Sequence, residues 1–286
     1  MYEVTPADPT IMLRFNRRLF LILWLVGMAG VLSILLIDLP ALIAALPMPA
    51  GAVPPELPPP ALLKLVSVIQ PAVLMTLAVA LGVWLAPKVG LDAPAFEALA
   101  ASGTGAFLEK LKPQIVPGVI AGALGGVGIV ATWVIAKPFL TAEFISQAER
   151  FNTLLPAAVR FLYGGLAEEL LLRWGLMTLL VWAGSRIAAL VVRRKNDGGE
   201  IERVPSGAVV IAAIIISAVV FAMGHLPIAS LLNGGLTLPL VIYVISANSL
   251  FGVVAGFLYW RRGLEAAMIA HMFAHVVLLA AISLSF

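Results

Sequence analysis

Six ionisable side chains interrupt long apolar stretches in the second half of this 286-residue sequence, and they include all three of its histidines. Carboxylates and imidazoles are the side chains that most often transfer protons or bind metal ions. Their concentration in apolar segments indicates an active site or an ion path. The six residues are Glu168, Glu169, Arg173, His225, His271 and His275.

The spacing of the acidic pair suggests two different roles. Arg173 follows Glu169 by four residues, so on a helix the two side chains face each other, with the acid before the base. Glu168 is rotated by about 100° from Glu169 and has no such partner. We therefore predict a buried ion pair between Glu169 and Arg173, which leaves Glu168 free for proton transfer. The alternative is one inert salt-bridge cluster that only fixes helix packing.

The histidines lie in or beside the last apolar segments. Phe221 precedes His225 by four residues, and Pro227 predicts that the helix ends or kinks near His225. His271 and His275 are one turn apart and share a face. Each alone is typical of packing or an interhelical hydrogen bond, but polar residues at membrane depth are costly and are rarely kept for packing alone.

The composition identifies the surroundings of these residues. Hydrophobic residues make up 62% of the chain, charged residues 12%, and the mean hydropathy is +1.06. A soluble domain is about 45–50% apolar and about 25% charged, so a soluble globular protein is excluded. The absence of cysteine excludes disulfides and thiolate chemistry. The basic residues form no patch, so no nucleic-acid partner is expected. We predict an all-α, polytopic bundle of transmembrane helices whose partner is the lipid bilayer.

The long apolar run 154–192 decides the number of spans. Counted as one crossing, with a cytoplasmic N-terminus, it leaves 13 Lys and Arg inside and four outside; counted as two, it leaves six inside and 11 outside. Basic residues prefer the cytoplasmic side, so one crossing is favoured, with a tilt, a kink near Gly164–Gly165, or an extension past Arg186. We predict seven spans, with eight as the alternative, in a bacterial inner membrane. The other runs lie near 19–37, 62–86, 115–136, 207–224, 238–260 and 264–284.

The remaining segments suggest two regions. Residues 1–112 carry two spans, a proline-rich loop over 47–60 and an amphipathic interfacial segment over 90–112. Residues 113–286 carry the candidate site on three helices, and include a solvated loop over 193–206.

Together these motifs resemble the CPBP family of CAAX-type and bacteriocin-processing intramembrane proteases, which includes the type II CAAX prenyl endopeptidases. The resemblance covers roughly residues 115–285 and rests on Glu168-Glu169-x-x-x-Arg173, Phe221-x-x-x-His225 and His271. It implies an intramembrane endopeptidase in which Glu168 and His225 activate a water. His271 and the residue four later would stabilise the oxyanion, and Glu169, Arg173 and Phe221 would support them. The implied substrate is a membrane-associated or lipidated peptide.

The chain departs from the family pattern at His275, where Asn or Asp is usual. An imidazole can still donate a hydrogen bond to an oxyanion. It also completes a nitrogen and oxygen donor set for zinc, with Glu168, His225 and His271. We expect no cofactor, and keep a zinc-dependent protease as an alternative, although the internal Glu of the zincin motif His-Glu-x-x-His is missing.

Two other classes of function remain open from the sequence. One is a bacteriocin-immunity or assembly partner without catalysis, and the other is a proton-coupled transporter. For the protease, we expect the polar groups to line a cavity that opens toward the cytoplasm. The sequence does not identify the substrate, its prenylation or the oligomeric state.

Overall fold

The computed structural model describes residues 15–47, 58–193 and 205–284, and these residues form helices joined by short connections, with no strand among them. Seven of the described helical segments are long and apolar enough to cross a membrane. The all-α class and the count of seven spans are therefore confirmed. The proline-rich loop and the loop over 193–206 lie mostly outside the described residues.

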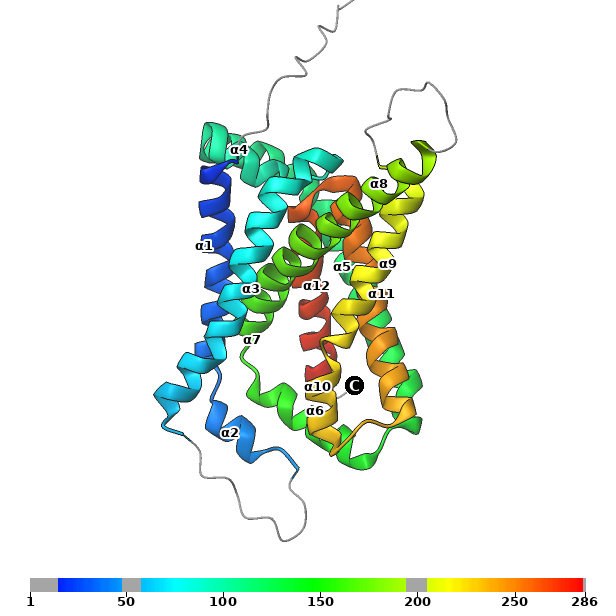
Figure 1. The fold of residues 1–286 in the computed structure, drawn as a ribbon. Coiled ribbons are helices and arrows are strands. Elements are labelled where there is room, and N and C mark those ends of the chain that lie inside the picture. Colours follow the sequence, from blue (N-terminus) through cyan, green and yellow to red (C-terminus); the bar gives the residue numbers. More distant parts are fainter. Residues whose placement is uncertain (1–14, 48–57, 194–204, 285–286) are drawn as a thin grey trace, which may run out of the picture.

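The spanning segments form an elongated bundle (Figure 1). In chain order they are α1 with η1 (Arg17–Ser33, Ile34–Leu36), α3 (Pro60–Val89), α5 with η2 (Thr104–Ala136, Lys137–Phe139), the continuous segment α7, η3, η4 and α8 (Ala157–Val159, Arg160–Glu168, Leu170–Met177, Thr178–Arg193), α9 with α10 (Gly207–Met223, Leu226–Asn233), α11 (Leu238–Arg262) and α12 (Leu264–Ser283). Shorter helices lie at the bundle ends: α4 (Pro94–Ser102) at one end, and α2 (Leu39–Ala44) and α6 (Ala142–Leu154) at the other.

Local signals in the sequence fix where several helices begin and end. Asn16, Thr141 and Thr237 each accept a hydrogen bond from the backbone N–H three residues later, which satisfies a free donor of the first turn. The helix α9 ends at Met223, and α10 begins at Leu226 with a proline in its first turn. The predicted interruption at His225 is confirmed.

The segment 90–112, expected to be interfacial, is divided between two helices. Gly103, with φ +87°, separates the short helix α4 from the start of α5, so Lys112 belongs to a spanning helix. Glu265 at the start of α12 accepts a hydrogen bond from the backbone N–H of Phe96 at 2.8 Å, which holds α4 against the bundle end. The division proposed between residues 112 and 113 therefore falls inside α5.

The long apolar run crosses once, as the charge distribution predicted. Figure 1 shows this segment running obliquely across the bundle in front of α12, and α8 extends to Arg193. Both the tilt and the extension past Arg186 are present. Near Gly164–Gly165 the structure shows a π-helical stretch, from Arg160 to Glu168, where a kink was the third possibility.

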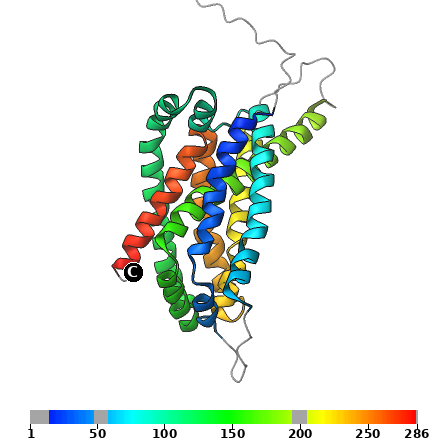
Figure 2. The same ribbon diagram turned by 90° about the vertical axis from the view of Figure 1, so that its left-hand side faces the viewer.

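Small residues let the neighbouring helices approach this oblique segment. The glycines Gly30 of α1 and Gly82 of α3 lie against Ala167 and Trp174, and α1 and α3 run side by side in both views (Figures 1 and 2). Gly122 of α5 allows the backbone of α12 to pack directly against it, which sets the depth of the histidines on α12.

Candidate active site

The two adjacent glutamates lie where two π-helical stretches meet. Glu168 ends η3, and Glu169 separates it from η4. A π-helix bonds each residue to one five positions away instead of four, and such local widening is frequent at functional sites. The deformation turns the two neighbouring carboxylates toward different partners.

Glu169 is the buried member of the pair. It has no exposed surface, and its Oε1 atom lies 3.0 Å from Nη1 of Arg173. The Nη2 atom of Arg173 donates to the backbone carbonyl of Gly252 at 3.1 Å. The ion pair predicted from the spacing is confirmed, and it is tied to α11 as well as to its own helix.

A second contact of Glu169 was not predicted. The same Oε1 atom lies 2.7 Å from Nδ1 of His271 on α12. Because Glu169 also accepts from Arg173, it is an acceptor, and Nδ1 of His271 is the donor. The ring then turns its Nε2 atom toward Glu168, whose Oε2 lies 3.8 Å away. Sequence spacing gives no signal for this contact, since the partners are 102 residues apart.

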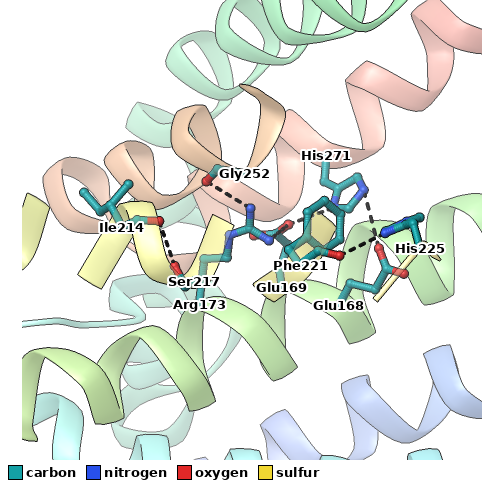
Figure 3. A network of polar contacts seen from close by, with 9 residues as sticks. All are labelled: Glu168, Glu169, Arg173, Ile214, Ser217, Phe221, His225, Gly252 and His271. Carbon is teal, nitrogen blue, oxygen red and sulfur yellow. Dashed lines mark hydrogen bonds and ion pairs between the residues drawn. The ribbon is translucent and has the colours of Figure 1, made fainter. Parts of the chain in front are cut away.

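His225 is held in a similar way. Its Nδ1 atom lies 3.0 Å from the carbonyl oxygen of Phe221, which can only accept, so Nδ1 carries the proton. In the neutral ring Nε2 then has a free lone pair. The Phe221 ring lies edge-on to both His225 and His271, at 4.8 and 6.0 Å between centroids. Figure 3 shows Glu168 pointing toward these two histidines.

His275 adds the last predicted member. Its ring is stacked on that of His271, with centroids 5.0 Å apart and planes inclined by 17°. Its Nδ1 atom is buried and has no hydrogen-bond partner among the described residues. Its Nε2 atom packs against Gly164, where an added Cβ would lie only 2.5 Å away. All seven residues selected from the sequence therefore belong to one network of neighbours.

The donors named for zinc are present but do not converge on a metal position. Within residues 15–47, 58–193 and 205–284, no three His, Asp or Glu side chains are arranged to hold a metal ion. The site as it stands does not fit a zinc ion.

A cavity of about 460 Å³ lies next to this network, between α5, α6, α11 and α12. Arg160, one of the four basic residues that the charge count gave to the non-cytoplasmic side, is 6% exposed and lines it. The cavity is at the end of the bundle that carries α6, opposite the end where α1 starts at Arg17 (Figure 1). The two expectations of a cytoplasmic N-terminus and a cytoplasmic cavity therefore contradict each other.

The seven candidate spans and this buried acid–imidazole network define an integral membrane protein with a candidate active site at membrane depth. Residues 150–277 match the family model described as type II CAAX prenyl endopeptidase Rce1-like, and the match includes all seven residues of the network. This segment belongs to that family, which confirms the resemblance seen in the sequence. The chain is thus a CAAX-type intramembrane endopeptidase, a peptide hydrolase. No curated protein and no solved structure matches the chain significantly.

Proposed function

We propose that Glu168 is the general base of this endopeptidase, and that it takes a proton from the water that attacks the scissile carbonyl of a membrane-associated or lipidated peptide. One observation carries this assignment. Of the two adjacent carboxylates, Glu169 is enclosed by Arg173 and His271, whereas the side chain of Glu168 is 19% exposed and its Oε2 lies 3.8 Å from Nε2 of His271. Of the two, only Glu168 is accessible to solvent.

His225 orients that water. With Nδ1 bonded to the carbonyl of Phe221, its Nε2 lone pair can accept a hydrogen bond from the water while Glu168 accepts the other. Because both hydrogens of the water are then bonded, one to Nε2 of His225 and one to Glu168, its lone pairs point away from these residues and toward the substrate carbonyl. After attack, Glu168 returns the proton to the leaving amine, as acid–base catalysis requires.

His271 and His275 stabilise the oxyanion. Since Nδ1 of His271 is bonded to Glu169, the ring can donate to an oxyanion only through a protonated Nε2. The Nδ1 atom of His275, buried without a partner among the described residues, is a second available donor. Donors that face the developing charge usually provide the largest electrostatic contribution.

Glu169, Arg173 and Phe221 position these groups and take no part in the chemistry. Arg173 neutralises Glu169 and its guanidinium lies 5.1 Å from the centroid of the Phe221 ring. Phe221 in turn contacts both histidines. The supports thus form one connected unit behind the water site.

The test is the Glu168→Gln variant, assayed with a prenylated peptide that ends in a C-a-a-X sequence. The change keeps the size of the side chain and removes the base, so kcat should fall by about 10²–10⁴. Glu143→Gln, a change of the same kind at an exposed position of α6, should keep wild-type activity. Wild-type turnover by folded Glu168→Gln would refute the assignment.

We also propose a cytoplasmic N-terminus in a bacterial inner membrane. The support is the distribution of basic residues, 13 inside and four outside in this orientation. The cavity next to the site would then open on the non-cytoplasmic side.

A further inference from the structure

Arg160 is a buried cation whose hydrogen-bonding capacity is only partly used. Its side chain is 6% exposed, and its Nη2 atom donates to the carbonyl and the side-chain oxygen of Asn152, at 2.9 and 3.1 Å. Its Nε atom is buried without a partner among the described residues. Within the same part of the chain, no carboxylate lies within 4.0 Å of its guanidinium. A guanidinium in this state is suited to bind an anion in a bidentate manner.

The cavity beside Arg160 has the size and lining of a ligand site. Its volume of about 460 Å³ lies within the usual range for small-ligand pockets. Apolar and aromatic side chains make up most of its wall, among them Trp133, Phe144, Tyr243 and Leu278. An anionic group attached to apolar side chains would therefore find both of its partners here.

The cavity and the proposed catalytic residues lie along the same pair of helices, η3 and α12. The helices η3 and α12 pack against each other, with Glu168 facing His271 and, one turn away, Gly164 facing His275. One turn further, Arg160 and Leu278 both line the cavity. Arg160 thus lies eight residues from Glu168 on η3, a separation of at most about 12 Å, because a π-helix rises less per residue than the 1.5 Å of an α-helix. An extended peptide covers this distance with three to four residues.

We propose that Arg160 binds the terminal carboxylate of the substrate, with the apolar side chains of the last residues in the cavity. The inference rests on the proposed function, because it takes Glu168 as the position of the cleaved bond. The distance matches a C-a-a-X peptide, in which three residues follow the cysteine. Arg160 is then a specificity-determining residue, and Glu149, an exposed residue of the cavity lining, is an acidic group that would oppose the ligand.

Binding is tested directly, without cleavage. The probes are the tripeptide Val-Ile-Met with a free C-terminal carboxylate and the same tripeptide as its amide, titrated calorimetrically into the full chain in detergent. A charge-assisted contact predicts that the acid binds about 10- to 100-fold more tightly than the amide. Arg160→Gln should abolish the preference, Arg160→Lys should keep part of it, and Glu149→Gln should increase the affinity for the acid. Equal affinities for acid and amide, or no binding of either, would overturn the proposal.

Two controls separate a ligand contact from a structural role of Arg160. Arg150→Gln removes an exposed arginine of α6 that does not line the cavity, and should leave the preference unchanged. If Arg160→Gln fails to fold, because it also loses the bonds to Asn152, the preference of the wild type and the intermediate preference of Arg160→Lys still decide the matter. If Arg160 had only a structural role, neither the wild type nor Arg160→Lys would prefer the tripeptide acid over the amide.

The cleavage assay distinguishes a failure of this inference from a failure of the proposed function. With prenylated peptides, the wild type should show a lower KM for the free acid than for the amide, and Arg160→Gln should lose this difference with a smaller effect on kcat. Glu168→Gln should lose kcat and still bind the tripeptide acid like the wild type. Cleavage of acid and amide with the same KM would overturn the role of Arg160 and leave that of Glu168 intact.

Discussion

His271 donates through Nδ1 to Oε1 of Glu169 at 2.7 Å, and this contact joins the last helix of the chain to the oblique segment in the bundle. It determines which ring nitrogen faces Glu168. The two adjacent carboxylates therefore have different surroundings. Glu169 contacts Arg173 and His271, while Glu168 is partly exposed and, in the proposed mechanism, binds the water. The same substitution, glutamate to glutamine, should therefore affect stability at position 169 and activity at position 168.

Glu169→Gln should lower stability, whereas Glu168→Gln should lower activity alone. An amide at position 169 leaves the buried Arg173 without its counter-charge, and breaking a buried pair costs about 3–5 kcal/mol. At position 168 no ion pair closer than 3.8 Å is lost, so the melting temperature should stay near that of the wild type. Thermal unfolding of both variants in the same detergent, with activity measured in parallel, checks the contrast. Equal losses of stability would show that the two carboxylates form one inert cluster.

The close packing of His275 on Gly164 gives a second prediction. A Cβ at position 164 would lie 2.5 Å from Nε2 of His275, so Gly164→Ala forces the ring away by about 1 Å. A misplacement of this size can cost about 10²-fold in rate, and we expect kcat to fall by that order. Gly105→Ala, a helical position with nothing within 4 Å, is the matched control and should retain full activity. Unchanged turnover in Gly164→Ala would argue that the position of His275 does not matter for catalysis.

The sequence predicted best those features that involve residues close together in the chain. The four-residue spacing of Glu169 and Arg173 predicted their ion pair, and Pro227 predicted the interruption at His225. Charge distribution predicted that the run 154–192 crosses once. The ion pair and the interruption follow from the geometry of one helix, and the single crossing follows from the preference of basic residues for one side of the membrane. Each of these predictions concerns one segment of the chain.

The contacts between distant segments could not be predicted. The bond between Glu169 and His271 depends on how α12 packs against η3, where Gly164 and Gly165 allow the close approach of His275 and Met272. The π-helical geometry has no signature in the hydropathy pattern. The charge count gave Arg160 to the non-cytoplasmic side, and only the packing of α6 reveals that it is buried. The cavity is a property of four helices together.

Metal chelation gives a third prediction. In the described part of the chain no three ligand side chains are grouped for a metal ion. Prolonged treatment with EDTA or 1,10-phenanthroline should therefore leave peptide cleavage unchanged. Elemental analysis of the purified protein should find far less than one equivalent of zinc. Loss of activity on chelation, restored by added zinc, would establish the zinc-dependent alternative instead.

The orientation in the membrane can be measured directly because the chain contains no cysteine. Ser102 at the end of α4 and Ser146 of α6 are both exposed and lie at opposite ends of the bundle (Figure 1). With a cytoplasmic N-terminus, a membrane-impermeant maleimide should label Ser146→Cys in intact spheroplasts and should label Ser102→Cys only after lysis. In lysed membranes both variants should be labelled, which shows that each introduced cysteine can react with the maleimide. The reverse pattern would place the N-terminus outside and the cavity with Arg160 on the cytoplasmic side, so this one experiment fixes the side from which a peptide substrate enters.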